Sequence, residues 1–311
     1  MNILIYGIGG VGGYFGGKLA NTKHHVSFIA RGGHLKAIQE KGLFVKSFLG
    51  DFKATPDLAT DRLTNIPTPD LILMGVKSWQ LEQAAKELAP HISNGTLVLP
   101  LQNGVNNPEK LMTSIPEDQI LNGFCNLISF IEAPGIICHQ AFRPTLSMGE
   151  LDNQRTDRIE RIHAVFLEAG VESKIPEDIH REQWKKFMFI TTISAIGGLT
   201  RSTIGEMRSS PYLYQMMRDT AFEILKVAQA KHINIARDDV DKVFEIIAKQ
   251  DPQSTASTQR DLMHGKPSEL ENFNGYIVEQ AKKHGIQAPV NELILACLLP
   301  MERRARAGLK S

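Results

Sequence analysis

The chain opens with a glycine-rich pattern of the form G-x-G-x-x-G, made by Gly7-Ile8-Gly9-Gly10-Val11-Gly12. The apolar run Asn2–Tyr6 precedes it, and small and apolar residues at helical spacing follow it, which predicts a strand, a tight turn and a helix. In that context Gly7 makes the turn, Gly9 lets the backbone approach a pyrophosphate, and Gly12 lets the helix pack closely on the strand. The pattern therefore predicts a dinucleotide site at a helix N-terminus, with a purely structural turn as the alternative.

Three polar residues, Arg31, Lys77 and Asn103, each follow an apolar run that predicts a buried strand. The three runs are residues 25–30, 70–76 and 96–101. Because ligands of open parallel sheets bind at the carboxyl ends of the strands, we expect these side chains and the glycine pattern to form one site. An NAD site usually carries an acidic residue where Arg31 stands, whereas a guanidinium can bind the 2′-phosphate of NADPH. The pattern favours NADPH, and ordinary solvated side chains are the alternative.

A second group of residues lies in the stretch 180–199, the longest largely apolar segment, which we predict to be a buried helix. Lys185 and Lys186 are successive helical positions, so at most one of them faces a cleft. Lys186 shares a stripe with Ile190 and Ser194, at spacings of four and eight residues. Apolar walls can lower the pKa of an amine until it works as an acid. Two lysines that extend from a helix edge into solvent are an equally good interpretation.

Two later segments carry polar residues at helical spacing. Ser257 and Asp261 are one turn apart. Ser268 and Glu271 fit the two ends of a capping box, which places Glu269 in the first turn of a helix. The helix dipole favours an ionised carboxylate there, so a structural role alone would explain Glu269.

The composition excludes several functional classes. A net charge of +1 gives no electrostatic case for binding nucleic acid or an acidic membrane, and 42% hydrophobic with 22% charged residues is typical of a soluble enzyme. Three scattered cysteines argue for a reducing compartment, and with no signal sequence or membrane-length apolar run we expect a cytoplasmic protein. The ten histidines show no metal-ligand spacing, so we expect no metal.

The length of 311 residues favours two domains. Residues 1–177 alternate buried strands with helices, which predicts a Rossmann-type, doubly wound α/β domain. Residues 41–52 suggest a hairpin, and residues 119–149 suggest short strands that complete the same sheet. Residues 178–311 predict an all-helical domain.

Taken in order, the motifs of this chain resemble those of the ketopantoate reductase (2-dehydropantoate 2-reductase) family, over nearly its whole length. The motifs are Gly7–Gly12, Val76-Lys77-Ser78-Trp79-Gln80, Gln102-Asn103-Gly104, Trp184-Lys185-Lys186, Ser257 with Asp261, and Glu269 with Asn274-Gly275. The resemblance implies a nucleotide domain followed by a helical substrate domain, with NADPH in the cleft between them. It also implies reduction of 2-dehydropantoate to pantoate, a step toward pantothenate and coenzyme A.

The resemblance implies roles for single residues as well. Lys186 would be the general acid that protonates the ketone oxygen, and Glu269 would assist it. Arg31 would bind the 2′-phosphate. The residues implied to contact the substrate are Lys77, Asn103, Ser194 and Ser257. The residues implied to contact the cofactor are Gly7, Ile8, Gly9, Gly10, Val11, Gly12, Arg31, Lys77, Asn103 and Glu269.

Two positions depart from the family pattern, because Ile190 and Ser194 stand where the family carries substrate-binding asparagines. Thr191, Thr192 or Ser194 could compensate. The first alternative is therefore a reductase of a different 2-keto acid. A 3-hydroxyacid dehydrogenase and a non-catalytic NADPH-binding regulator are further alternatives. The partner we expect is a small 2-keto acid, not nucleic acid or membrane, and a homodimer is compatible with the sequence.

Overall fold

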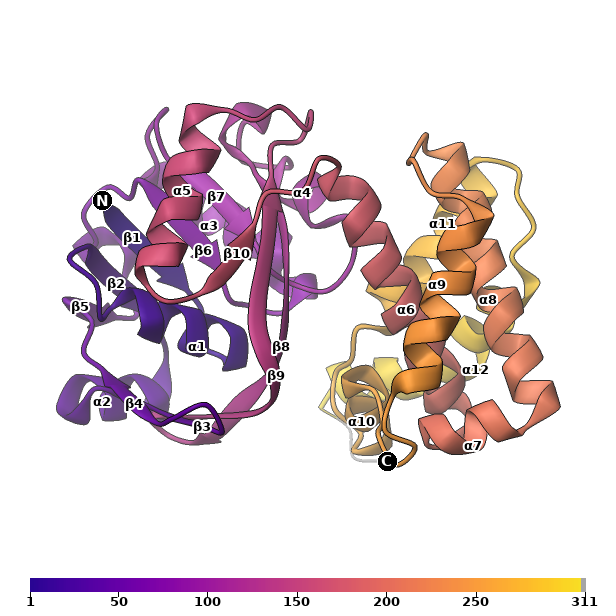
Figure 1. Ribbon diagram of the computed structural model, residues 1–311. Coiled ribbons are helices and arrows are strands. Elements are labelled where there is room, and N and C mark those ends of the chain that lie inside the picture. Colours follow the sequence, from indigo (N-terminus) through magenta and orange to yellow (C-terminus); the bar gives the residue numbers. More distant parts are fainter. Residues whose placement is uncertain (309–311) are drawn as a thin grey trace. The chain divides into compact units, whose positions relative to one another are not determined.

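A computed structural model describes residues 1–308, and the chain divides into two compact units. The first unit, Met1–Ile179, combines strands with helices, whereas the second, from His180 onward, is all-helical in its described residues. Figure 1 labels these elements. The predicted fold class, an α/β part with a parallel sheet followed by a helical part, is confirmed.

Five parallel strands form the central sheet of the first unit, in the order β5-β2-β1-β6-β7. Their bounds are Leu58–Thr60 (β5), His25–Ile29 (β2), Asn2–Tyr6 (β1), Leu71–Met74 (β6) and Leu97–Pro100 (β7). Tyr6 at the end of β1 pairs in register with Ile29 and with Met74. Met74 in turn pairs with Pro100. The carboxyl ends of these four strands are therefore level, and the residues that follow them lie at one edge of the sheet.

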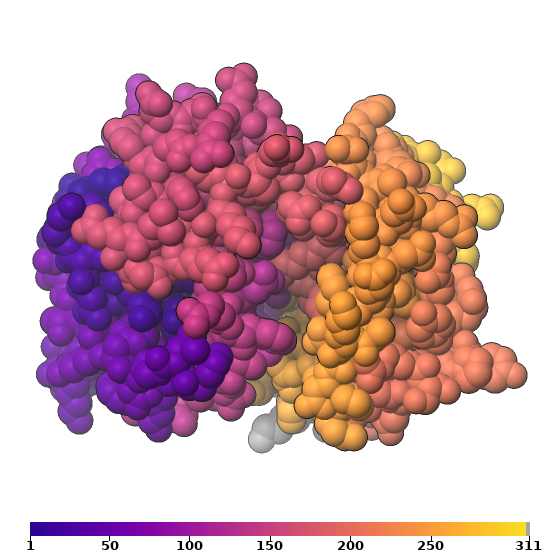
Figure 2. Space-filling model, in the orientation of Figure 1, coloured from indigo at the N-terminus to yellow at the C-terminus, as the bar shows by residue number. Residues whose placement is uncertain are grey.

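Helices cover both faces of this sheet (Figure 1). The α-helices are α1 (Gly10–Leu19), α2 (Gly32–Lys41), α3 (Leu81–Leu88), α4 (Asn107–Leu111) and α5 (Asp157–Glu168). Short 3-10 turns are η1 (Leu63–Asn65), η2 (Ser78–Gln80), η3 (Ala89–His91) and η4 (Glu117–Gln119). In the space-filling view, α5 and its flanking residues (rose) form much of the visible face of this unit (Figure 2).

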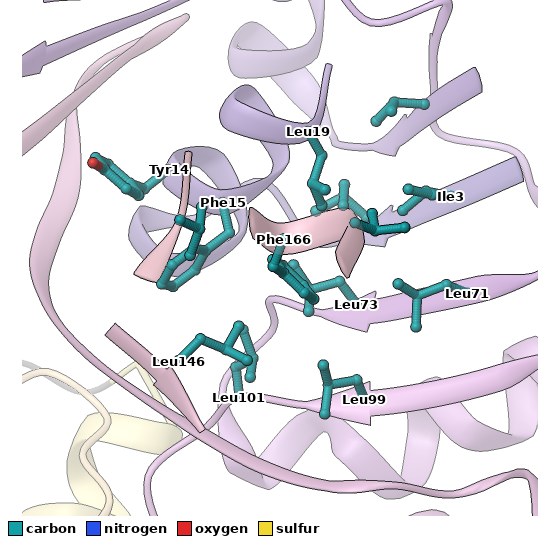
Figure 3. Packing of buried hydrophobic residues seen from close by; sticks show 14 of the residues in the cluster. Ile3, Tyr14, Phe15, Leu19, Leu71, Leu73, Leu99, Leu101, Leu146 and Phe166 are labelled. Atoms are coloured by element: carbon teal, nitrogen blue, oxygen red, sulfur yellow. The ribbon is translucent and has the colours of Figure 1, made fainter. Parts of the chain in front are cut away.

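The core of the unit explains why the strands are apolar throughout. Ile3 of β1 belongs to one hydrophobic cluster with Phe15 of α1 and Phe166 of α5, and Figure 3 shows these rings beside the strand side chains. Leu4, the next residue, belongs to a second cluster with Leu81 of α3. Because successive strand residues point to opposite faces, a sheet covered on both faces needs apolar residues at every position.

A second sheet corrects one expectation. It contains β3 (Leu43–Ser47), β4 (Phe52–Ala54), β8 (Asn122–Ala133), β9 (Ile136–Gly149) and β10 (Glu172–Lys174). The predicted β3–β4 hairpin is confirmed. The prediction that residues 119–149 add short strands to the central sheet is wrong, because β8 and β9 form one long hairpin in this separate sheet. Register shifts, and a positive φ of 64° at Phe142, interrupt the apolar/polar alternation of these residues, although β8 and β9 remain paired.

The second unit is a bundle of helices. They are α6 (Ile179–Thr200), α7 (Ile204–Ser209), α8 (Pro211–Ala230), α9 (Arg237–Lys249), α10 (Ser257–Met263), the π-helical turn η5 (Glu271–Gly275), α11 (Tyr276–Lys283) and α12 (Pro289–Arg306). Helix α8 packs against α7, α9, α11 and α12, and α12 also packs against η5. The predicted buried helix over residues 180–199 corresponds to α6. Within the described residues, no helix has the length and apolar character that a membrane crossing requires.

The first prediction concerns the close approach of α1 to the sheet. A Cβ atom at Gly12 would lie 2.0 Å from the carbonyl oxygen of Gly7, so we expect Gly12→Ala to push α1 away from β1. The expected loss in the free energy of unfolding is about 1–3 kcal/mol or more. Urea unfolding can measure it in a Trp184→Phe background, where Trp79 is the remaining tryptophan and reports the first unit.

Gly33→Ala is the matched control, because nothing lies within 4 Å of its added Cβ. Alanine also favours the helical conformation there, so stability should stay constant or rise by about 0.5–1 kcal/mol. Equal losses in the two variants would contradict the steric explanation.

Candidate functional site

The glycine pattern forms a tight crossing of backbone segments. Gly7 directly follows β1 and has a positive φ of 99°, a conformation that favours glycine. Its carbonyl oxygen would lie 2.0 Å from a Cβ at Gly12 and 2.2 Å from a Cβ at Gly75. At Gly9 an added Cβ would meet just one atom within 4 Å, the Gly75 oxygen at 3.6 Å, so this side of the turn is open. The arrangement suits a phosphate group at the N-terminus of α1.

The second sheet also reaches the start of α1. An added Cβ at Gly10 would lie 2.2 Å from the carbonyl oxygen of Ser129 in β8, so glycine is required for this approach. The Ser129 hydroxyl is buried there without a hydrogen-bond partner in the described part of the chain. No sequence motif indicates Ser129, because the interrupted pattern of residues 119–149 conceals the length of β8.

A pocket of about 370 Å³ opens at the carboxyl ends of β1, β2 and β6. Of the predicted site residues, Gly7, Ile8 and Arg31 line it, whereas Lys77 and Asn103 do not. The lining residues that sequence reasoning missed or did not assign to the cofactor include Tyr6, His34, Trp79, Gln80, Gln83 and Glu87. The ends of β1, β2 and β6 therefore share one pocket that excludes the loop after β7, and α3 supplies a wall that no local motif indicates.

A hydrogen-bonded carboxylate forms part of that wall. The buried Tyr6 hydroxyl donates to Oε2 of Glu87, and Gln83 Nε2 donates to Oε1 at 3.1 Å. The Arg31 guanidinium lies 3.5 Å from the same Oε2. These hydrogen bonds, chiefly that of Tyr6, lower the pKa of Glu87, while burial and then Glu87 itself raise the pKa of Tyr6. The pocket therefore contains a fixed negative charge beside its predicted phosphate-binding cation.

The loops that carry Lys77 and Asn103 are held together by Gln102, which is buried. Gln102 Nε2 donates to the carbonyl oxygens of Met74 at 2.7 Å and Val76 at 3.0 Å. This places the two loops side by side at the ends of β6 and β7. Lys77 is exposed, and its Nζ lies 5.6 Å from the centroid of the Trp79 ring. Lys77 and Asn103 thus occupy adjacent loops outside the 370 Å³ pocket.

In the helical unit, both lysines of α6 are half-buried. Lys185 Nζ donates to Glu182 Oε1 at 2.8 Å within the same helix. Lys186 is half-buried, and Ser194 lies two turns farther along. The hydroxyls of Ser194, Thr191 and Thr192 are all buried without a hydrogen-bond partner in the described residues. This polar segment of α6 therefore retains unused hydrogen-bonding capacity.

Glu269 is 5% exposed. The residue before it, Ser268, is hydrogen-bonded to the buried carboxylate of Glu302. The Ser268 N–H donates to both oxygens of Glu302, at 3.1 and 3.0 Å, and its hydroxyl donates to Glu302 as well. The predicted capping box is wrong, because Glu271 instead pairs with Arg306 at 3.2 Å.

Ser257 begins α10 and is exposed. Among residues 1–308, no group of three or more side chains could hold a metal ion.

Comparison with known proteins identifies the class and then the family. The family model "Ketopantoate reductase PanE/ApbA" matches residues 3–153, and "Ketopantoate reductase PanE/ApbA C terminal" matches residues 178–302. The chain is therefore an oxidoreductase of the nicotinamide-dependent class. It belongs to the ketopantoate reductase family, which confirms the resemblance read from its motifs.

Individual relatives cover almost the whole chain. It is 31% identical over 296 residues to a 2-dehydropantoate 2-reductase of Pyrococcus abyssi, covering 94% of this chain and 95% of that one. The crystal structure of a PanE/ApbA family ketopantoate reductase from Ralstonia eutropha has a TM-score of 0.89 and 28% identity, covering 98% of this chain and 100% of that one. A D-mandelate dehydrogenase structure with NADH and anilino(oxo)acetate has a TM-score of 0.87, 21% identity and coverage of 98% and 100%, which shows a shared fold.

The second prediction concerns His34, whose Nδ1 accepts the N–H of Gly135 at 3.0 Å. Burial lowers the pKa of His34 below its usual 6.5, so the folded state favours the neutral ring. The neutral His34 ring makes its full contribution to the free energy of unfolding above about pH 6.5, the usual pKa that applies in the unfolded chain. That contribution is lost as the pH falls from there through the lowered pKa of the folded state. We expect wild-type stability to fall more than that of His34→Gln between pH 7.5 and 5, as measured by urea unfolding. Parallel pH profiles for the two proteins would contradict this.

Proposed function

We propose that this protein reduces 2-dehydropantoate (ketopantoate) to pantoate with NADPH in the cytoplasm, a step toward pantothenate and coenzyme A. The observation that carries the proposal is the pocket in which Arg31 lies with the glycine turn, in a chain whose two units both match the ketopantoate reductase family. The open turn at Gly9 and the N-terminus of α1 suit a pyrophosphate. The Arg31 guanidinium suits a 2′-phosphate.

The proposed chemistry divides between the two units. When bound, NADPH supplies a hydride to the carbonyl carbon. The Lys186 ammonium donates a proton to the carbonyl oxygen, which would otherwise carry the negative charge of an alkoxide. Glu269 assists Lys186 in this proton transfer. The residues proposed to orient the substrate and the nicotinamide are Lys77, Asn103, Ser194 and Ser257.

The position of Lys186 along α6 supports its choice as the acid. Lys186 shares its helical stripe with Ser194, whose buried hydroxyl is available for a ligand. A proton donor and a hydrogen-bonding group therefore follow one another along one side of the helix.

A second candidate function is the reduction of a different, more apolar 2-keto acid. Ile190 favours it, because an aliphatic side chain cannot bond a substrate hydroxyl where the family carries an asparagine. A polar group of 2-dehydropantoate left unpaired there would cost about 1–3 kcal/mol. The buried hydroxyls of Thr191 and Ser194 could replace the missing amide, and this favours the first candidate.

The third prediction tests the acid and the substrate together. NADPH oxidation is followed with 2-dehydropantoate and a panel of 2-keto acids that differ in the polarity of their side chains. We expect the highest kcat/KM with 2-dehydropantoate. Lys186→Ala should lower kcat by about 10²- to 10⁴-fold, because it removes the proton donor.

Lys185→Ala is the matched control and should keep most of the activity. Loss of activity in Lys185→Ala, with Lys186→Ala unaffected, would reverse the assignment of the acid. A higher kcat/KM with an apolar 2-keto acid would favour the second candidate. Tight NADPH binding without turnover of any acid in the panel would contradict both.

A further inference from the structure

The pocket at the ends of β1 and β2 contains two opposite charges. Arg31 and Glu87 both line it, and the guanidinium Nη2 lies 3.5 Å from the carboxylate Oε2. The residues come from different parts of the fold, Arg31 from the segment between β2 and α2 and Glu87 from the last turn of α3. Any group that binds Arg31 inside this pocket must therefore approach a carboxylate as well.

The carboxylate is the fixed member of the pair. Tyr6, itself 5% exposed at the end of β1, donates to Glu87 Oε2, and Gln83 donates to Oε1. The Arg31 side chain is 74% exposed, so it has freedom to change its direction. Hydrogen bonding lowers the pKa of Glu87, which keeps it ionised at neutral pH. A ligand can displace the guanidinium from Glu87, but it cannot readily displace the charge of Glu87 from the pocket.

We infer that Glu87 is a specificity-determining residue that limits the preference of this site for NADPH over NADH. The inference rests on the proposed function, because it requires a nicotinamide dinucleotide in this pocket. A 2′-phosphate carries up to two negative charges and is repelled by Glu87 while it competes with Glu87 for Arg31. A ribose 2′-hydroxyl can instead donate a hydrogen bond to the same carboxylate. Glu87 thus disfavours the binding of NADPH and favours the binding of NADH.

The experiment, the fourth prediction, measures binding without catalysis. The full chain is titrated by calorimetry with adenosine 2′,5′-bisphosphate and with AMP, which differ by the 2′-phosphate and carry no nicotinamide. Glu87→Gln keeps the shape of the side chain and its capacity to accept from Tyr6. We expect it to raise the affinity for the bisphosphate relative to AMP by about tenfold, because one repulsive charge is lost.

Three further variants isolate the charge effect. Gln83→Glu adds a carboxylate to the same wall and should move the ratio in the opposite direction. Glu82→Gln makes the same change as Glu87→Gln at an exposed position of α3 outside the pocket, so the ratio should stay constant. Arg31→Ala should remove most of the preference for the bisphosphate.

The outcomes separate this inference from the function on which it rests. If Glu87→Gln weakens bisphosphate binding, Glu87 orients Arg31 for the phosphate and the inference is overturned. An unchanged ratio in Glu87→Gln, with both ligands still bound, also overturns it and leaves the nucleotide site standing. Failure of the wild-type protein to bind either ligand or NADPH would overturn the proposed function and the role of Glu87 together.

Discussion

The arrangement of the first unit depends on the contact between three glycines at the crossing of β1, α1 and β6. The carbonyl oxygen of Gly7 occupies the space that a side chain at Gly12 or Gly75 would need. Any side chain at these positions would push α1 off the sheet and change the direction of its N-terminus. Because that N-terminus carries the backbone N–H groups that suit a phosphate, packing and ligand recognition depend on the same contact.

The pairing register of the parallel strands places their carboxyl ends at one edge of the sheet. Once β1 is in register with β2 and β6, the segments that follow these strands must converge. Gln102 then ties the two loops after β6 and β7 through a pair of carbonyl oxygens. The edge of the sheet acquires two neighbouring parts, a pocket beside Arg31 and the adjacent loops that carry Lys77 and Asn103.

In the helical unit, buried carboxylates hold segments in place by accepting hydrogen bonds from them. Glu223 of α8 accepts the N–H groups of Val290 and Asn291 at the start of α12. Glu302, near the end of α12, holds Ser268 beside Glu269 and is paired with Arg306 at 2.7 Å. Each acid is compensated by several donors, as a buried charge must be. Helix α12, which contributes none of the proposed catalytic residues, therefore fixes the segment that carries one of them.

Local patterns in the sequence were sufficient for the glycine turn, the buried strands, the buried helix over residues 180–199 and the family, because backbone sterics and periodicity act over a few residues. The long hairpin was missed because its irregular register hides the alternation of a strand. Only the tertiary structure joined Tyr6 to Glu87, 81 residues away, and Ser268 to Glu302, 34 residues away. Such pairs depend on how whole elements pack against one another. The residues of a single strand or helix therefore do not specify which distant side chain they will contact.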